Sequence, residues 1–136
     1  MTTKIKIGMV GSREYTNKRS IKDLLFNLKE QHDDVEIVSG GQKQGADGIV
    51  KKYALEFDMD YTEFPPEHYQ HNMHCKLSAK NYNKPYYISN YFKRNKQIAE
   101  YCDIVIGFIP SNSDSRGTKH TLGEAKKQNK LVKIIN

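Results

Sequence analysis

Apolar residues recur along the chain in five short runs that predict β-strands. Residues 4–10 alternate apolar and polar positions, whereas 35–38 and 103–109 are nearly continuous apolar segments. Alternation is typical of a strand with one buried face, and a continuous run is typical of a strand buried on both faces. Weaker runs at about 59–64 and at 131–135 complete the set.

Four segments between these runs have the spacing of amphipathic helices. Ser20 is placed to cap the first, whose apolar stripe consists of Ile21, Leu24, Leu25 and Leu28. The others are predicted over about 46–57, from Ser89 or Asn90 to about Tyr101, and from Thr118 to about Gln128.

Regular alternation of strands and helices predicts an α/β fold. We expect a Rossmann-like, three-layer α/β/α arrangement with a parallel sheet of about five strands. Residues 1–136 are long enough for one domain with its own core. The stretch at about 65–89 has no clear periodicity, and we expect an irregular excursion there with a short helix around 67–79.

Composition narrows the class of protein. No apolar run is long enough to span a bilayer, and the first strand leaves no room for a signal-peptide apolar region. The two cysteines are too few for a disulfide framework, so we expect a cytoplasmic protein. The net charge of +6 favours an anionic partner.

The segment 35–48 combines a strand, a glycine-rich turn and the start of a helix. Its glycines allow positive φ and close approach of a ligand, and a helix N-terminus favours an anion. The gap between Gly40 and Gly45 has P-loop length, but Ala46 and Asp47 stand where a P-loop has Lys and Ser/Thr. We therefore predict a phosphate-cradling turn that is not an NTPase site; a glycine-rich connection without a ligand is the alternative.

Three loops leave the carboxyl ends of the predicted strands, at Gly11–Arg13, Ser39–Asp47 and Pro110–Thr118, and the third helix begins near the same edge. In parallel sheets, ligands bind beyond these strand ends. Arginine binds phosphate through a planar fork of donors. All four arginines lie in or near these segments, which predicts an anion site there: Arg13, Arg19, Arg94 and Arg116.

Four motifs, VGSREY, VSGGQKQGAD, KRNKQIAEYCDIVIGF and RGT, occur in this order. Together they resemble the YspA/YpsA-related branch of the SLOG superfamily, which is Rossmann-like and related to the Lonely Guy phosphoribohydrolases and to DprA. The resemblance implies a nucleotide or nucleotide-derived ligand. The motifs and loops together give these candidate ligand-binding residues: Gly11, Ser12, Arg13, Ser39, Gly40, Gly41, Gly45, Ala46, Asp47, Arg94, Asn95, Arg116, Gly117 and Thr118.

The chain departs from the Lonely Guy pattern at two places, of which the first argues against hydrolysis and the second concerns the pocket wall. In those enzymes an arginine at the place of Arg94 and a glutamate three residues after the Gly-Thr threonine serve in N-glycosidic cleavage. Here Thr121 stands at the second place, and Glu124 lies about one helical turn further on. The usual Ala-Gly pair before Arg94-Asn95 is also replaced, by residues 91–93. If the protein is a hydrolase, Arg94 and Glu124 are its catalytic candidates.

Histidines and tyrosines are concentrated in the excursion. His68, His71 and His74 lie near Cys75, but their spacing lets at most two share a helical face, so we expect neither a metal nor a cofactor. The tyrosines can stack on a base or lie in a subunit contact, which we favour. They are Tyr69, Tyr82, Tyr86, Tyr87 and Tyr91. Asp47 either satisfies the first turn of its helix or binds a ligand.

Three function hypotheses follow. The first is a module that senses or sequesters a phosphorylated nucleotide or nucleotide-derived signal at the carboxyl edge, in a phage or a host signalling system. The second is a hydrolase of nucleoside 5′-monophosphates, and the third is a single-stranded DNA binder like DprA. We favour a non-enzymatic binding module that forms homo-oligomers and does not bind membranes.

Overall fold

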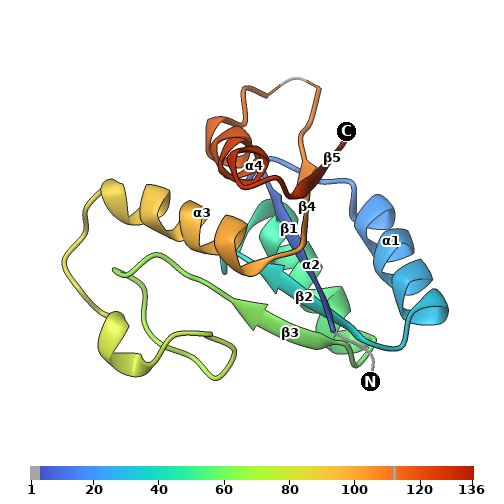
Figure 1. The fold of residues 1–136 in the computed structure, drawn as a ribbon, viewed down its shortest axis with the longest axis horizontal. Helices are drawn as coiled ribbons and strands as arrows, with labels where there is room; N and C mark the ends of the chain where they lie inside the picture. Colours follow the sequence, from blue (N-terminus) through green and yellow to red (C-terminus); the bar gives the residue numbers. More distant parts are fainter. Residues whose placement is uncertain (1–3, 112) are drawn as a thin grey trace.

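The computed structural model describes residues 4–111 and 113–136, and contains a five-stranded parallel sheet flanked by helices (Figure 1). The strand order is β3-β2-β1-β4-β5, and every neighbouring pair is parallel. The predicted Rossmann-like α/β fold is therefore confirmed. The strands are β1 (Ile5–Gly11), β2 (Val35–Ser39), β3 (Asp60–Glu63), β4 (Ile104–Phe108) and β5 (Leu131–Ile135).

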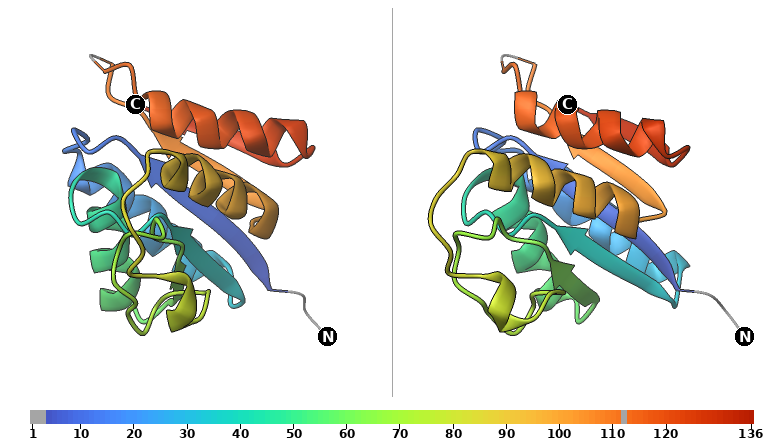
Figure 2. Two further views of the ribbon diagram at one scale, coloured as in Figure 1. Left: turned by 90° about the vertical axis from the view of Figure 1, so that its left-hand side faces the viewer. Right: turned by 60° about the vertical axis from the view of Figure 1, so that its left-hand side comes forward.

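Helices cover both faces of the sheet (Figure 2). One face carries α1 (Lys18–Gln31) and α2 (Gly45–Glu56), and the other carries α3 (Ser89–Tyr101) and α4 (Arg116–Lys127). Right-handed crossovers between parallel strands place consecutive helices in this way. No helix in the described part of the chain is long and apolar enough to cross a membrane.

Two apolar clusters hold the layers together. On the α1 and α2 face, Met9 and Phe108 of the central strands pack with Leu25 and Val50 of the helices. On the α3 and α4 face, the corresponding cluster includes Val105, with Ile98, Ala99 and Leu122 from the helices. Successive side chains of a strand point to opposite faces, which is why the continuous apolar run 103–109 supplies both clusters.

Two helix starts differ from the sequence-based expectation. Ser20 does not cap α1: the helix begins at Lys18, and the Asn17 side chain accepts a hydrogen bond from the Ser20 amide at 3.1 Å. Asparagine is an effective N-cap because its carbonyl oxygen reaches a free amide of the first turn. α4 begins at Arg116, two residues before the expected Thr118.

The segment between β3 and α3 contains one turn of 3-10 helix, η1 (Ala79–Asn81), and otherwise has no helix. The short helix expected around 67–79 is therefore wrong. Backbone hydrogen bonds hold the segment against β3 instead, from the Glu63 amide to the His74 carbonyl (2.9 Å) and from the Lys76 amide to the Glu63 carbonyl (3.0 Å). The Asn72 side chain accepts from the His74 amide at 2.8 Å, a local bond that competes with helix formation.

Candidate functional site

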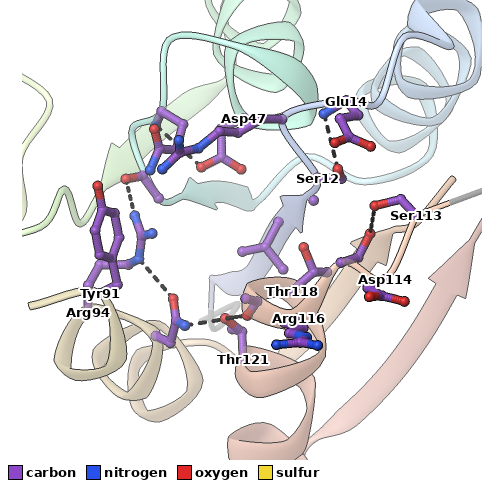
Figure 3. Close-up of a pocket in the computed structure, with 18 of the residues that line it drawn as sticks. Ser12, Glu14, Asp47, Tyr91, Arg94, Ser113, Asp114, Arg116, Thr118 and Thr121 are labelled. Atoms are coloured by element: carbon purple, nitrogen blue, oxygen red, sulfur yellow. Dashed lines mark hydrogen bonds between the residues drawn. The ribbon is translucent and has the colours of Figure 1, made fainter. Parts of the chain in front are cut away.

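A cavity of about 760 Å³ opens at the carboxyl ends of β1, β2 and β4 (Figure 3). Four separate segments line it: the β1–α1 loop, the glycine loop after β2, the start of α3, and the β4–α4 loop with the first turn of α4. The size suits a small-molecule ligand.

Most of the residues proposed from the sequence meet in this cavity. Its lining includes Gly11, Ser12, Arg13, Gly40, Asp47, Arg94, Asn95, Arg116, Gly117 and Thr118. Ser39, Gly41, Gly45 and Ala46 are not among the lining residues. The Ser39 hydroxyl is hydrogen-bonded to the Tyr61 hydroxyl at 2.6 Å.

Gly45 and Gly40 fit where a side chain would not. Gly45 has φ of +68°, and a Cβ there would lie 2.3 Å from the Ser12 carbonyl oxygen, so this glycine lets α2 start against the β1–α1 loop. A Cβ on Gly40 would lie 2.4 Å from an Arg94 guanidinium nitrogen and 2.8 Å from the Asp47 carboxylate. Gly40 therefore separates this cation from this anion.

Arg94 lines the cavity but is only 8% exposed. Its Nη1 donates to the Gly40 carbonyl, and its Nε donates to Asn95 Oδ1 at 2.9 Å. The Asn95 side-chain amide donates in turn to the Gly117 carbonyl at 3.4 Å. Arg94 and Asn95 therefore join the glycine loop to the start of α4, whatever contact they make with a ligand.

Asp47 is buried in the first turn of α2, at the edge of the cavity. Its Oδ2 accepts a hydrogen bond from the Gln42 amide at 3.3 Å, whereas its Oδ1 has no hydrogen-bond partner among the described residues. Burial raises the pKa of this carboxyl to about 6, because the nearby Arg94 charge and the Gln42 amide offset the loss of hydration only in part.

The first turn of α4 forms the opposite wall. Ser115 precedes it in the left-handed conformation, with φ of 49°, and makes no side-chain cap hydrogen bond within the described residues. The segment from Ser113 to Thr118 lines the cavity, so the start of the helix lies beside it. The amides and the dipole at such a terminus favour an anion.

Charges of both signs line the cavity. Three lining residues are cationic, Arg13, Arg94 and Arg116, and three are acidic, Glu14, Asp47 and Asp114. The expectation that all four arginines lie at this edge is wrong for Arg19, whose exposed side chain is 3.7 Å from Asp23 on the surface of α1. That helix carries Arg19 away from the loop in which Arg13 remains.

An apolar wall completes the cavity at the N-terminal end of α3. It consists of Ile88, Tyr91 and Phe92, of which Ile88 is 66% exposed. The Tyr91 ring centroid lies 5.8 Å from the Arg94 guanidinium carbon and 6.0 Å from that of Arg13. The sequence pattern placed the loop Pro110–Thr118 at this edge, but only the fold shows that Ser113 and Asp114 of this loop line the cavity together with Ile88.

The two residues weighed for glycosidic cleavage differ in position. Thr121 lines the cavity, and its hydroxyl donates to the Gly117 carbonyl at 3.2 Å. Glu124 is not a lining residue; its carboxylate lies 3.7 Å from His120 and 3.5 Å from Lys127 on α4.

The histidines of the excursion do not assemble with other ligands. The described residues contain no group of three or more His, Cys, Asp or Glu side chains suited to a metal ion. His68 packs among the rings of Tyr69, Tyr86 and Tyr91.

The fold resembles that of two solved structures. The molybdenum cofactor binding protein from Rippkaea orientalis is 18% identical and superposes with a TM-score of 0.71, over 98% of this chain and 77% of that one. The molybdenum cofactor carrier protein from Chlamydomonas reinhardtii is 14% identical, with a TM-score of 0.69 over 97% of this chain and 76% of that one. At this identity the likeness concerns the fold.

Sequence comparison gives the family. Among curated proteins, none matches the sequence of this chain significantly. Residues 6–71 match the model of the YspA, cpYpsA-related SLOG family, which covers β1 to β3 and the glycine loop. The resemblance predicted from the sequence motifs is thereby confirmed for residues 6–71, which match the model of this family; the motifs around Arg94 and Gly117 lie outside the matched residues.

Proposed function

We propose that the protein binds a phosphorylated nucleotide or a nucleotide-derived small molecule in the cavity at the carboxyl edge of its sheet. One observation carries this proposal: Arg13, Arg116 and the start of α4 border the same cavity as the apolar residues of α3. If the phosphate of a nucleotide binds near the arginines and the start of α4, the planar base of the same nucleotide can lie against Tyr91 or Phe92.

The comparisons support a small ligand. Two proteins of the same fold are described as binding or carrying the molybdenum cofactor. Their ligand is a small molecule that is bound without being named as a substrate, which agrees with a sensing or sequestering role for this chain. The molybdenum cofactor is therefore a ligand to include in the titrations.

A second function, single-stranded nucleic acid binding, is favoured by one observation. A smaller cavity of about 350 Å³ is lined by Arg13, Lys18, Lys43 and Lys52 around Tyr53, with no acidic residue among the lining residues described. Residues from the β1–α1 loop, α1, the glycine loop and α2 form this cluster, so their proximity follows from the fold and not from their order in the sequence.

A competition titration over a salt series separates the two functions. We expect mononucleotides to bind more tightly than an oligonucleotide at about 150 mM salt, with an affinity that falls only shallowly as salt rises. An oligonucleotide that engages several phosphates has a slope of roughly −0.7 per phosphate. If the oligonucleotide binds more tightly and has the steep slope, the DNA-binding function replaces the one proposed. Mass spectrometry of molecules that co-purify with the protein would identify the ligand directly.

Three further expectations belong to the same proposal. We propose that residues 1–136 act as one domain and that the protein works in the cytoplasm as a homo-oligomer. The exposed apolar residues of the excursion support self-association, and these include Met73, Tyr86 and Tyr87.

A further inference from the structure

The smaller cavity, of about 350 Å³, carries positive charge that no carboxylate offsets. Three of its lining residues are exposed lysines from α1, the glycine loop and α2, namely Lys18, Lys43 and Lys52. In the described part of the chain none of the three forms an ion pair. The cavity of about 760 Å³, called the main cavity below, has three acidic residues beside its three arginines, whereas no acidic residue is among those described for the smaller one. The smaller cavity therefore attracts anions without an opposing carboxylate.

The two cavities are neighbours on either side of the β1–α1 loop. Arg13, in this loop, lines both of them, and its guanidinium carbon lies 6.0 Å from the ring centroid of Tyr91 in the main cavity. The loop packs directly on the start of α2, where the Ala46 amide donates to the Ser12 carbonyl at 3.1 Å. A Cβ on Gly45 would lie only 2.4 Å from the Arg13 Cα. The wall between the cavities is therefore a single segment of backbone, which a ligand can cross beside Arg13.

The smaller cavity suits a phosphate better than a second base. The ammonium groups of Lys52 and Lys22 lie 5.3 and 5.7 Å from the ring centroid of Tyr53, and the Phe57 ring stacks on that ring at 5.9 Å. Tyr15, the other aromatic lining residue, is only 3% exposed. The cavity therefore offers ammonium donors and no free aromatic face among the described residues, and lysine binds phosphate as a point charge.

We infer that the smaller cavity binds a second phosphate of the ligand whose first phosphate lies in the main cavity. This inference rests on the proposed function, which puts the first phosphate near Arg116 and the start of α4. The ligand class is then a nucleotide with two separate phosphate groups, such as a nucleoside 3′,5′- or 2′,5′-bisphosphate. A nucleoside monophosphate leaves the lysines without an anion, and a 5′-diphosphate keeps both of its phosphates on one side of the loop.

The test is an isothermal titration of the wild-type protein with AMP, ADP, adenosine 3′,5′-bisphosphate and adenosine 2′,5′-bisphosphate. ADP is an isomer of both bisphosphates, so it controls for the number of phosphates. At least one bisphosphate should bind about tenfold more tightly than both AMP and ADP, since a hydrogen bond between charged groups contributes about that much. If AMP binds and neither bisphosphate binds more tightly than ADP, the inference is overturned and the proposed function stands.

A double substitution, Lys43→Gln with Lys52→Gln, removes the charge of the smaller cavity. Its control is Lys126→Gln with Lys127→Gln at the exposed end of α4, which removes the same charge on the other face of the sheet. The first variant should bring the ratio of bisphosphate affinity to AMP affinity close to one, and the control should keep the wild-type ratio.

The remaining outcomes separate the alternatives. An unchanged ratio in the variant of the smaller cavity overturns the inference and leaves the proposed function intact. The same holds if that variant weakens the binding of a thymidine oligonucleotide while the ratio stays unchanged, because the lysines then serve nucleic acid. If no nucleotide binds the wild type, the proposed function itself fails, and this inference fails with it.

Discussion

The Arg94 guanidinium donates a hydrogen bond to the Gly40 carbonyl, which lies 54 residues earlier in the chain. The bond joins the start of α3 to the glycine loop after β2. Both groups are buried, and Asp47 lies on the far side of Gly40. The shape of the candidate site therefore depends on an arginine that belongs to another part of the sequence.

Gly40→Ala should damage the cavity. The new Cβ would lie within 3 Å of both Arg94 and Asp47, so one of these side chains must move. We expect a loss of about 2 kcal/mol in the free energy of unfolding, together with the loss of nucleotide binding. Urea denaturation and a ligand titration measure the two effects.

Gly123→Ala is the control for that change. A Cβ at Gly123 meets nothing within 4 Å, and the residue lies inside α4 and away from the cavity lining. The substitution should raise the free energy of unfolding by up to about 1 kcal/mol, since alanine is the better helix former. Equal effects at the two glycines would contradict the close packing inferred at Gly40.

Arg94→Lys should destabilise the fold. Lysine cannot place donors on both the Gly40 carbonyl and Asn95 Oδ1, and buried acceptors would lose their partners. We expect a loss of about 3 kcal/mol in the free energy of unfolding. Arg19→Lys, on the exposed face of α1, should change it by less than about 0.5 kcal/mol. Similar values for the two variants in urea denaturation would contradict the structural role given to Arg94.

The Asp47 carboxyl should make stability depend on pH. Burial raises its pKa in the folded protein to about 6, above the ordinary value of 3.8, so the folded state binds the proton more tightly. The contribution of Asp47 to stability is therefore present below about pH 4 and is lost as the pH rises through about 6. The free energy of unfolding of Asp47→Asn minus that of the wild type should increase over this range. A flat difference between pH 4 and 7 would show that Asp47 is not the buried acid described here.

The tyrosine-rich excursion should mediate self-association. Tyr86 and Tyr87 are both more than 60% exposed, and Ile88 continues the apolar surface. We expect light scattering at micromolar concentration to give a dimer or a larger assembly, and Tyr87→Glu to dissociate it. Leu55→Glu, at an exposed leucine of α2, is the control and should leave the assembly unchanged. A wild-type monomer would contradict the prediction.

Incubation with nucleoside monophosphates should release little or no free base. Thr121, at the place of the expected glutamate, is hydrogen-bonded to the Gly117 carbonyl, and Glu124 lies away from the cavity lining. Glycosidic cleavage requires a carboxylate close to the reacting carbon, and neither of these two residues brings one to the cavity. Robust base release in a chromatographic assay would contradict this prediction and establish the hydrolase instead.

The order of strands and helices was readable in the sequence because it depends on local patterns. Apolar runs and amphipathic spacing are enough to place a strand or a helix, and their alternation is enough to predict a parallel sheet. The start of α1 was misplaced because Asn17 and Ser20 are both good capping residues. The helix expected in the excursion was wrong because its backbone bonds are made with β3 and with asparagine side chains.

The composition of the candidate site was only partly readable. Glycine motifs and arginines indicated a site at the carboxyl edge of the sheet, since the loops that follow parallel strands all begin at that edge. Tertiary contacts decided which side chains line the cavity: Arg94 reaches Gly40, Arg19 is carried away on α1, and Ser113 reaches the cavity through the loop after β4. The empty acceptor of Asp47 is a property of its three-dimensional surroundings, because hydration and hydrogen-bond partners depend on what packs around a group and not on its neighbours in sequence.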